Sequence, residues 1–278
     1  IAEIGINHNG HLDLAKRMIE ASKDAGADAV KFQKRNFEAL LLPGVVIQEP
    51  TGYLSRDEND MPSEEKAFGT WTYPDKRLEF TNEQVYELWQ YAESKGLNFI
   101  VSPWEEKSVD FLVKHNAKVI KLASIDTTNY QFCEYIASKG IPTLISTGMC
   151  NYEQLQVVWN IFDDAQCPMV FLHCTSAYPS PMEDKHLRCI PVIQDMFDME
   201  IGFSGHAVAL EGTLAAITLG ANVVEKHVTL SRKMSGPDQA ASLEFSELKE
   251  LIEKASNIVK ALGLPRKNFL PSEKVLHG

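Results

Sequence analysis

Short apolar runs rich in Val and Ile recur along the 278-residue chain, and amphipathic segments separate most of them. Parallel strands that are buried on both faces have this character, because neither face of such a strand meets water. The pattern predicts eight strands, at residues 2–6, 29–32, 99–101, 119–120, 143–145, 169–172, 200–203 and 222–224. Eight strands that alternate with helices indicate a (β/α)₈ TIM barrel, in which the chemistry occurs at the C-terminal ends of the strands.

Helical periodicity fills the intervals between these runs. It predicts helices at residues 12–25, 83–95, 107–115, 130–138, 152–162, 184–197, 210–219 and 246–262. In the first of them Leu14, Met18 and Ala21 share one side, and Gly26 is a typical helix terminator. The sequence Thr81-Asn82-Glu83-Gln84 fits a capping box at the start of the second helix.

The predicted domain organisation is one catalytic barrel over residues 1–263. Its second strand is followed by a turn-rich loop at residues 34–80, which we interpret as a functional loop or a surface excursion. Residues 264–278 contain two prolines and mixed charge, and we interpret them as a linker.

Composition excludes several classes of partner. A formal net charge of −11 argues against nucleic-acid binding, which needs a basic surface. No apolar run approaches the roughly 20 residues of a membrane-spanning helix, so we expect no membrane association. Five cysteines without a CxxC pair favour reduced thiols and a cytoplasmic protein.

Two histidines follow neighbouring predicted strands. His206 comes after the seventh strand, and His227 ends the eighth. Because adjacent strands lie about 4.8 Å apart, the two imidazoles could hold one divalent cation and leave positions open for a substrate oxygen. Glu225 lies two residues before His227 in the predicted strand, so both side chains point to the same face. Glu225 is therefore either a third metal ligand or a hydrogen-bond partner of a ligand. Histidines that are hydrogen-bonded in loops are the alternative.

Two lysines end the second and fourth strands, namely Lys31 and Lys121. Hydroxyl side chains follow nearby strand ends: Ser124, Ser146, Thr147 and Ser204. Ammonium and hydroxyl groups together would suit phosphate or carboxylate. The alternative is that each lysine pairs with a core carboxylate, Glu3 for Lys31 and Asp126 for Lys121.

Two acidic residues are further candidates. Glu3 lies inside the first strand between apolar neighbours, so it must pair, bind a ligand or have a raised pKa. We keep three roles for it: general acid–base, acceptor for a sugar hydroxyl, and salt bridge. Asp238 lies in a tight loop after the eighth strand and could accept hydrogen bonds from hydroxyls, although a turn-forming Asp is the alternative.

Taken together, the motifs resemble the sialic acid synthase family. The opening IAEIGINHNG at residues 1–10 is similar to the start of that family. Six further motifs follow in the family's order: GADAVKFQ (26–33), STGM (146–149), LHCTSAYP (172–179), GFSGH (202–206), EKH (225–227) and GPD (236–238). Seven motifs in order across nearly the whole chain make this resemblance specific.

The resemblance implies a transferase that forms a carbon–carbon bond. Such enzymes condense phosphoenolpyruvate with the aldehyde form of an N-acetylated hexosamine and with water, and release a nonulosonic acid and phosphate. The hexosamine is N-acetylmannosamine or a diacetamido-trideoxyhexose. A divalent metal is implied, most often Mn²⁺, with Mg²⁺ and Co²⁺ as alternatives.

Roles carry over by motif. The resemblance assigns phosphoenolpyruvate binding to Lys31, Lys121, Ser124, Ser146, Ser176 and Ser204. It assigns sugar binding to Glu3, Gln33, Tyr178 and Asp238, and metal binding to His206 and His227. The predicted catalytic residues are Glu3, Lys31, Lys121, His206 and His227. The family often has Asn in place of Ser176 and Asp in place of Gly205, and Ser176 would have a shorter reach.

In the family a small antifreeze-like domain follows the barrel and the protein is a domain-swapped dimer. We therefore expect residues 264–278 to lead towards such a domain, and a homodimer that is weakened if that domain is absent. Two alternatives remain: another metal-dependent barrel aldolase or phosphoenolpyruvate-condensing synthase, and a non-catalytic sugar-binding barrel.

Overall fold

A closed parallel barrel forms the body of the protein. The computed structural model describes residues 1–40, 47–51, 69–73 and 76–276. The strands follow one another in the order β1-β2-β5-β6-β7-β8-β9-β10, and a pairing of β1 with β10 closes the ring. They are β1 (Ala2–Gly5), β2 (Ala29–Lys34), β5 (Asn98–Pro103), β6 (Ile120–Leu122), β7 (Thr143–Ser146), β8 (Met169–Cys174), β9 (Ile201–Gly205) and β10 (Ala221–Thr229). The predicted (β/α)₈ class and all eight predicted strands are confirmed.

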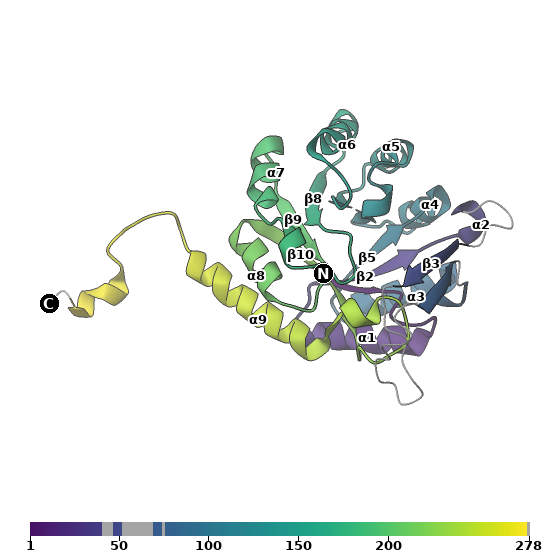
Figure 1. The fold of residues 1–278 in the computed structure, drawn as a ribbon, viewed down its shortest axis with the longest axis horizontal. Helices are drawn as coiled ribbons and strands as arrows, with labels where there is room; N and C mark the ends of the chain where they lie inside the picture. Colours follow the sequence, from purple (N-terminus) through teal and green to yellow (C-terminus); the bar gives the residue numbers. More distant parts are fainter. Residues whose placement is uncertain (41–46, 52–68, 74–75, 277–278) are drawn as a thin grey trace.

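Helices surround the barrel (Figure 1). They are α1 (Leu12–Ala25), α3 (Asn82–Ser94), α4 (Glu106–Lys114), α5 (Tyr130–Ala137), α6 (Tyr152–Asp164), α7 (Cys189–Phe197), α8 (Glu211–Thr218) and α9 (Phe245–Leu262). Gly26 ends α1 in the left-handed conformation (φ 92°), and Thr81 and Gln84 form the predicted capping box. Helix α7 begins later than predicted because His186 has φ 40° and ψ 46°, which no right-handed helix contains.

The hydrophobic core fills the layer between strands and helices. Ile4 and Phe32 belong to it, packed with helix residues such as Met18 and Leu88. Because side chains alternate along a strand, Glu3 and Lys31 face the opposite way, into the barrel. Burying the apolar residues outside the barrel therefore directs the polar residues of the same strands into its interior.

The segment after β2 contains regular structure that its turn-rich sequence did not reveal. Helix α2 (Phe37–Leu40) follows β2, and β3 (Ile47–Thr51) pairs antiparallel with β4 (Gly69–Tyr73) in a separate sheet. A short 3₁₀ helix, η2 (Lys76–Leu78), leads back to α3. The rest of the predicted loop, residues 41–46, 52–68 and 74–75, lies outside the described residues.

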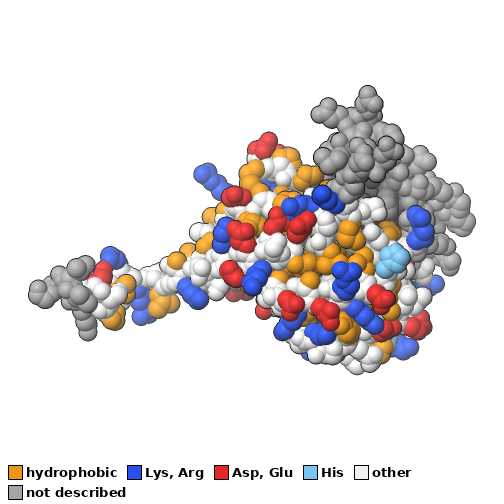
Figure 2. Space-filling model, turned by 90° about the horizontal axis from the view of Figure 1, so that it is seen from below, with side chains coloured by type: hydrophobic (Ala, Val, Ile, Leu, Met, Phe, Trp, Pro, Cys, Tyr) orange, Lys and Arg blue, Asp and Glu red, His pale blue; other side chains and the backbone are white. Residues whose placement is uncertain are grey.

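The chain after α9 extends away from the barrel (Figure 1), and in the space-filling view it is a narrow projection (Figure 2). Its apolar side chains Leu264, Phe269 and Leu270 are exposed. A last 3₁₀ helix, η6, spans Pro271–Leu276. Within the part of the chain that the structure describes, none of the helices combines the length and apolar character needed to cross a bilayer.

Candidate active site

Every residue predicted for the site lies in a barrel strand or in the loop after its C-terminal end. Strand pairing brings distant positions together: Glu3 of β1 lies opposite Lys31 of β2 on one side and His227 of β10 on the other. The polar groups therefore form one cluster at one mouth of the barrel. Their roles in binding and catalysis stay predictions at this point.

The two histidines face each other. The ring centroids of His206 and His227 lie 5.3 Å apart, with the ring planes inclined by 61°. Nδ1 of His206 lies 3.1 Å from the carbonyl oxygen of Thr175, so Nδ1 donates and Nε2 keeps a lone pair. Burial lowers the pKa of His206 to about 3 and also lowers the pKa of His227. Both rings are therefore neutral near pH 7, which is the form that ligates metals.

This pair fits a divalent cation. Nδ1 of His227 is buried without a hydrogen-bond partner and lies 3.6 Å from Asp238 Oδ2. Across the described ranges no group of three or more His, Cys, Asp or Glu residues is arranged to hold a metal ion, which disfavours Glu225 as a third ligand. Glu225 instead accepts a 3.2 Å hydrogen bond from Ser204 Oγ. A cation held here would take its other ligands from substrate or water.

Lys31 lies between two buried carboxylates. Its Nζ is 2.9 Å from Glu3 Oε2 and 3.7 Å from Glu225 Oε1, and it donates a 3.0 Å hydrogen bond to Ser102 Oγ. The alternative pairing of Lys31 with Glu3 is thus confirmed. Burial lowers the pKa of Lys31, but Glu225 and Glu3 outweigh it and raise that pKa overall. Burial, together with the charge of Glu225, raises the pKa of Glu3 overall, although Lys31 and Gln33 lower it.

Lys121 differs from Lys31 in having only neutral hydrogen-bond acceptors. Its Nζ donates to Ser146 Oγ at 2.6 Å and to the carbonyl oxygen of Leu122 at 2.9 Å. The alternative pairing with Asp126 is wrong, because no ion pair joins the two residues and Asp126 instead has its pKa raised to about 6 by burial. Burial lowers the pKa of Lys121. The charge of Glu225 opposes this lowering from a distance, but no carboxylate of the described residues forms an ion pair with Lys121 Nζ. A bound anion would supply such a direct partner.

Hydroxyl groups gather around a glycine next to Lys121. Ser124 Oγ accepts a 3.1 Å hydrogen bond from the Gly148 amide. A Cβ added at Gly148 would collide with Ser176 Oγ and lie 2.8 Å from Ser124 Oγ. Ser176 therefore does reach this cluster despite its short side chain. Gly148 is a residue that sequence reasoning missed, and its place in the motif STGM was the available signal.

The predicted sugar residues surround another glycine, on the other side of Lys31. Gln33 Nε2 donates to Glu3 Oε1 at 3.3 Å. A Cβ on Gly5 would lie 3.1 Å from Glu3 Oε1, 3.4 Å from Gln33 Nε2 and 3.6 Å from Asp238 Oδ2. The ring of Tyr178 lies 4.1 Å from the ring of His206. Carboxylate, amide and aromatic groups thus meet beside the histidine pair, and such groups commonly bind sugar hydroxyls and sugar rings.

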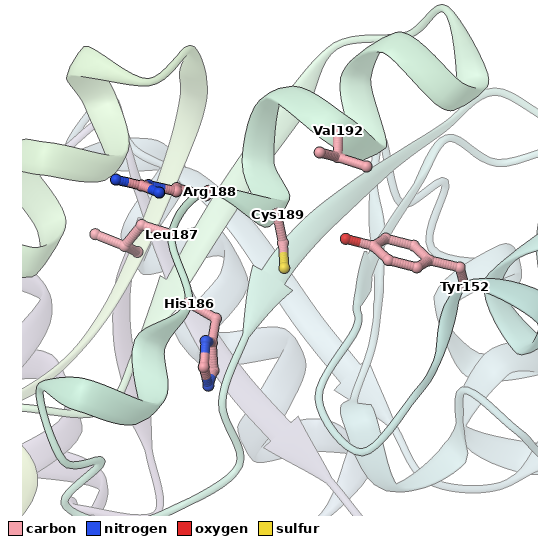
Figure 3. A pocket seen from close by; sticks show the side chains of 6 residues that line it. All are labelled: Tyr152, His186, Leu187, Arg188, Cys189 and Val192. Atoms are coloured by element: carbon pink, nitrogen blue, oxygen red, sulfur yellow. The ribbon is translucent and has the colours of Figure 1, made fainter.

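A hollow on the outside of the barrel is separate from this cluster. It has a volume of about 460 Å³ between the starts of α6 and α7 (Figure 3). Its lining residues are Tyr152, His186, Leu187, Arg188, Cys189 and Val192. None of the residues predicted for the site lines it, so it takes no part in the arrangement described above.

Comparison with known proteins agrees with the motifs. Residues 18–267 match the NeuB family. The chain is 40% identical to human N-acetylneuraminate-9-phosphate synthase over 276 residues, covering 98% of this chain and 73% of the relative. It is 34% identical to N,N′-diacetyllegionaminic acid synthase of Legionella pneumophila, covering 99% and 76%. The crystal structure of N-acetylneuraminic acid synthetase from Leptospira borgpetersenii, in complex with citrate, superposes with a TM-score of 0.85 at 29% identity, covering 99% and 88%.

Proposed function

The chain belongs to the NeuB family, and on that premise we propose that it is a nonulosonic acid synthase. It condenses phosphoenolpyruvate with an N-acetylated amino sugar in its aldehyde form and with water, and it releases a nonulosonic acid and inorganic phosphate. The observation that carries the proposal is the convergence of a neutral histidine pair, His206 and His227, with the Lys121 ammonium and its serines at one barrel mouth.

The Lys121 cluster is the anion site of this proposal. Lys121 and Ser146 bind phosphoenolpyruvate together with Ser124 and Ser176, whose hydroxyls lie next to Gly148. Lys31 and Ser204 extend the site towards Glu225. Ammonium groups that are already held by hydrogen bonds need no reorganisation when charge shifts onto the phosphate oxygens.

The proposed metal position lies next to the proposed site of the acceptor sugar. The family is generally metal-dependent, and His206 and His227 are the residues that would hold the ion. When bound, a divalent cation polarises the aldehyde oxygen and makes the aldehyde carbon electrophilic. We propose Mn²⁺, with Mg²⁺ and Co²⁺ as alternatives. Glu3, Gln33, Tyr178 and Asp238 hold the sugar hydroxyls and ring next to this position.

During the reaction, side chains of this protein stabilise the developing negative charge and transfer a proton. A bond forms between C3 of phosphoenolpyruvate and the aldehyde carbon, water adds at C2, and phosphate leaves with cleavage of its C–O bond. Lys31 and Lys121 stabilise the negative charge of the leaving group. The attacking water loses one proton when it adds at C2, and the sugar alkoxide gains one. The second proton of that water leaves the C2 hydroxyl as the ketone forms and departs on the phosphate. Glu3 transfers the first of these protons, and its raised pKa makes it a stronger base than an exposed carboxylate.

The test is release of phosphate from phosphoenolpyruvate with Mn²⁺ across a panel of N-acetylated hexoses, with mass detection of the product. We expect phosphate and a condensed acid in equal amounts, and loss of both in His206→Ala and Lys121→Met. Lys249→Met, on the exposed side of α9, is the matched control for Lys121→Met and should retain activity. A condensed product without phosphate would identify an aldolase, and sugar binding without any product would identify a non-catalytic barrel.

Two further proposals concern the state of the protein. We propose a homodimer, which light scattering at several concentrations would test. We also propose the cytoplasm as its compartment, because all five cysteines are free thiols.

A further inference from the structure

Two buried lysines lie outside the substrate cluster. Lys226 is 2% exposed and Lys185 is 4% exposed. Neither has an ion pair with a carboxylate within the part of the chain that the structure describes, although buried lysines usually have one. Both donate instead to oxygen atoms of the loops that carry His206 and Tyr178.

Lys226 holds the backbone beside His206. Lys226 lies between Glu225 and His227 on β10, so its side chain leaves the barrel on the opposite face. Its Nζ donates to the carbonyl oxygen of Ala207, the residue directly after His206. A Cβ on Gly205 would lie 3.4 Å from the same Nζ. The ammonium is therefore hydrogen-bonded to the residue after His206 and lies close to the residue before it.

Lys185 holds the loop that contains Tyr178. Its Nζ donates to Ser180 Oγ at 2.6 Å and to the carbonyl oxygen of Ser180 at 3.3 Å. The Ser180 amide in turn donates to the carbonyl oxygen of His206 at 2.8 Å. Hydrogen bonds thus connect Lys185 through Ser180 to the backbone of His206, and the next residue, Ala207, accepts from Lys226.

We propose that Lys226 and Lys185 are positioning residues for the metal and for the acceptor sugar. Lys226 keeps His206 in the orientation that binds the metal, and Lys185 keeps Tyr178 against the His206 ring through Ser180. Hydrogen bonds from an ammonium group to buried acceptors are stronger than neutral ones, so they can hold loops that have no other regular structure. The inference rests on the proposed function for the roles of His206 and Tyr178.

The experiment tests the role of Lys226 towards the metal and the role of Lys185 towards the acceptor sugar separately. Lys226→Met should weaken Mn²⁺ binding, measured by electron paramagnetic resonance without substrates, by about tenfold. Ser180→Ala, which removes only the hydroxyl bound by Lys185, should raise the KM for the acceptor about fivefold and leave the KM for phosphoenolpyruvate unchanged. Lys226→Gln keeps an N–H donor and should recover part of the Mn²⁺ affinity. Lys249→Met, on the exposed side of α9, is the control and should change neither value.

The outcomes distinguish positioning from general support of the fold. A merely structural role would lower the melting temperature or the active fraction without changing Mn²⁺ affinity or KM. Folded variants with wild-type Mn²⁺ affinity and wild-type acceptor KM would overturn the inference. If Lys226→Met does not fold, Lys226→Gln and Ser180→Ala decide the matter by the same criteria. If the wild type released no phosphate, the proposed function and the role of Lys185 towards the acceptor would both be overturned. The role of Lys226 would still be decided by Mn²⁺ binding, which is measured without substrates.

Discussion

Replacing Lys31 by Met should destabilise the barrel strongly, because two buried carboxylates would lose their common cation. At an effective dielectric constant of about 20, the 2.9 Å and 3.7 Å separations from Glu3 and Glu225 correspond to attractions of about 6 and about 4.5 kcal/mol. Relief of the desolvation of Lys31 offsets a large part of this sum. We therefore expect Lys31→Met to lower the free energy of unfolding by about 3–5 kcal/mol.

The loss of unfolding free energy in Lys31→Met should be larger at high pH than at low pH. Burial already raises the pKa of Glu3, and loss of the neighbouring ammonium raises it further. A carboxyl group whose pKa is higher in the folded state than in the unfolded state destabilises the fold at high pH, and this penalty disappears as the group is protonated in both states. The stability gap between variant and wild type should therefore narrow from about pH 8 to about pH 5.

Urea unfolding followed by circular dichroism, without metal or substrate, measures these differences. Lys16→Met is the matched control, because Lys16 has a carboxylate partner (Glu87, at 2.6 Å) whose side chain is half exposed. Solvent screens that pair, so its loss should leave stability nearly unchanged. Adding Glu3→Gln to Lys31→Met should restore part of the loss. Equal small effects of the two lysine variants, or a double variant less stable than Lys31→Met, would refute the reasoning.

Three other changes have defined outcomes. Chelation of divalent ions should abolish phosphate release. Mn²⁺ should raise the melting temperature of the wild type but not that of a His206→Ala/His227→Ala variant. An equal rise in both proteins would contradict the metal site. Gly148→Ala should raise the KM for phosphoenolpyruvate by about tenfold or more in steady-state kinetics, because the new methyl group collides with the Ser176 hydroxyl. An unchanged KM would argue against that hydroxyl as a ligand. Burial raises the pKa of Asp126 to about 6, so its ionised form destabilises the fold. Asp126→Asn should therefore stabilise the fold by about 1–2 kcal/mol near pH 7.5, a value reduced for partial solvent screening, and should have no such effect near pH 4. An equal gain at both pH values would refute this cause.

The periodicity of the sequence determined the strands, most of the helices and the fold class. The apolar runs predicted all eight barrel strands, and the first helix has the predicted bounds, Leu12–Ala25. Periodicity of this kind is local, because each strand must be apolar on the face that meets the helices, wherever its neighbours come from. The same logic missed β3 and β4. The sequence of β3 (IQEPT) is mostly polar and contains a proline, and β4 (GTWTY), although it alternates, is only five residues long and lies in a turn-rich segment.

The motifs determined the family and nominated the site, but the partners of each polar group depended on the closed barrel. Only the pairing of β1 with both β2 and β10 shows that Glu3 neutralises Lys31, whereas Lys121 has Ser146 and not Asp126. Only the packing of loops shows Lys226 at the Ala207 carbonyl. Burial of apolar surface depends on each residue alone, whereas a hydrogen bond depends on the distance between two atoms. For residues separated by hundreds of positions, that distance exists only once the barrel has closed.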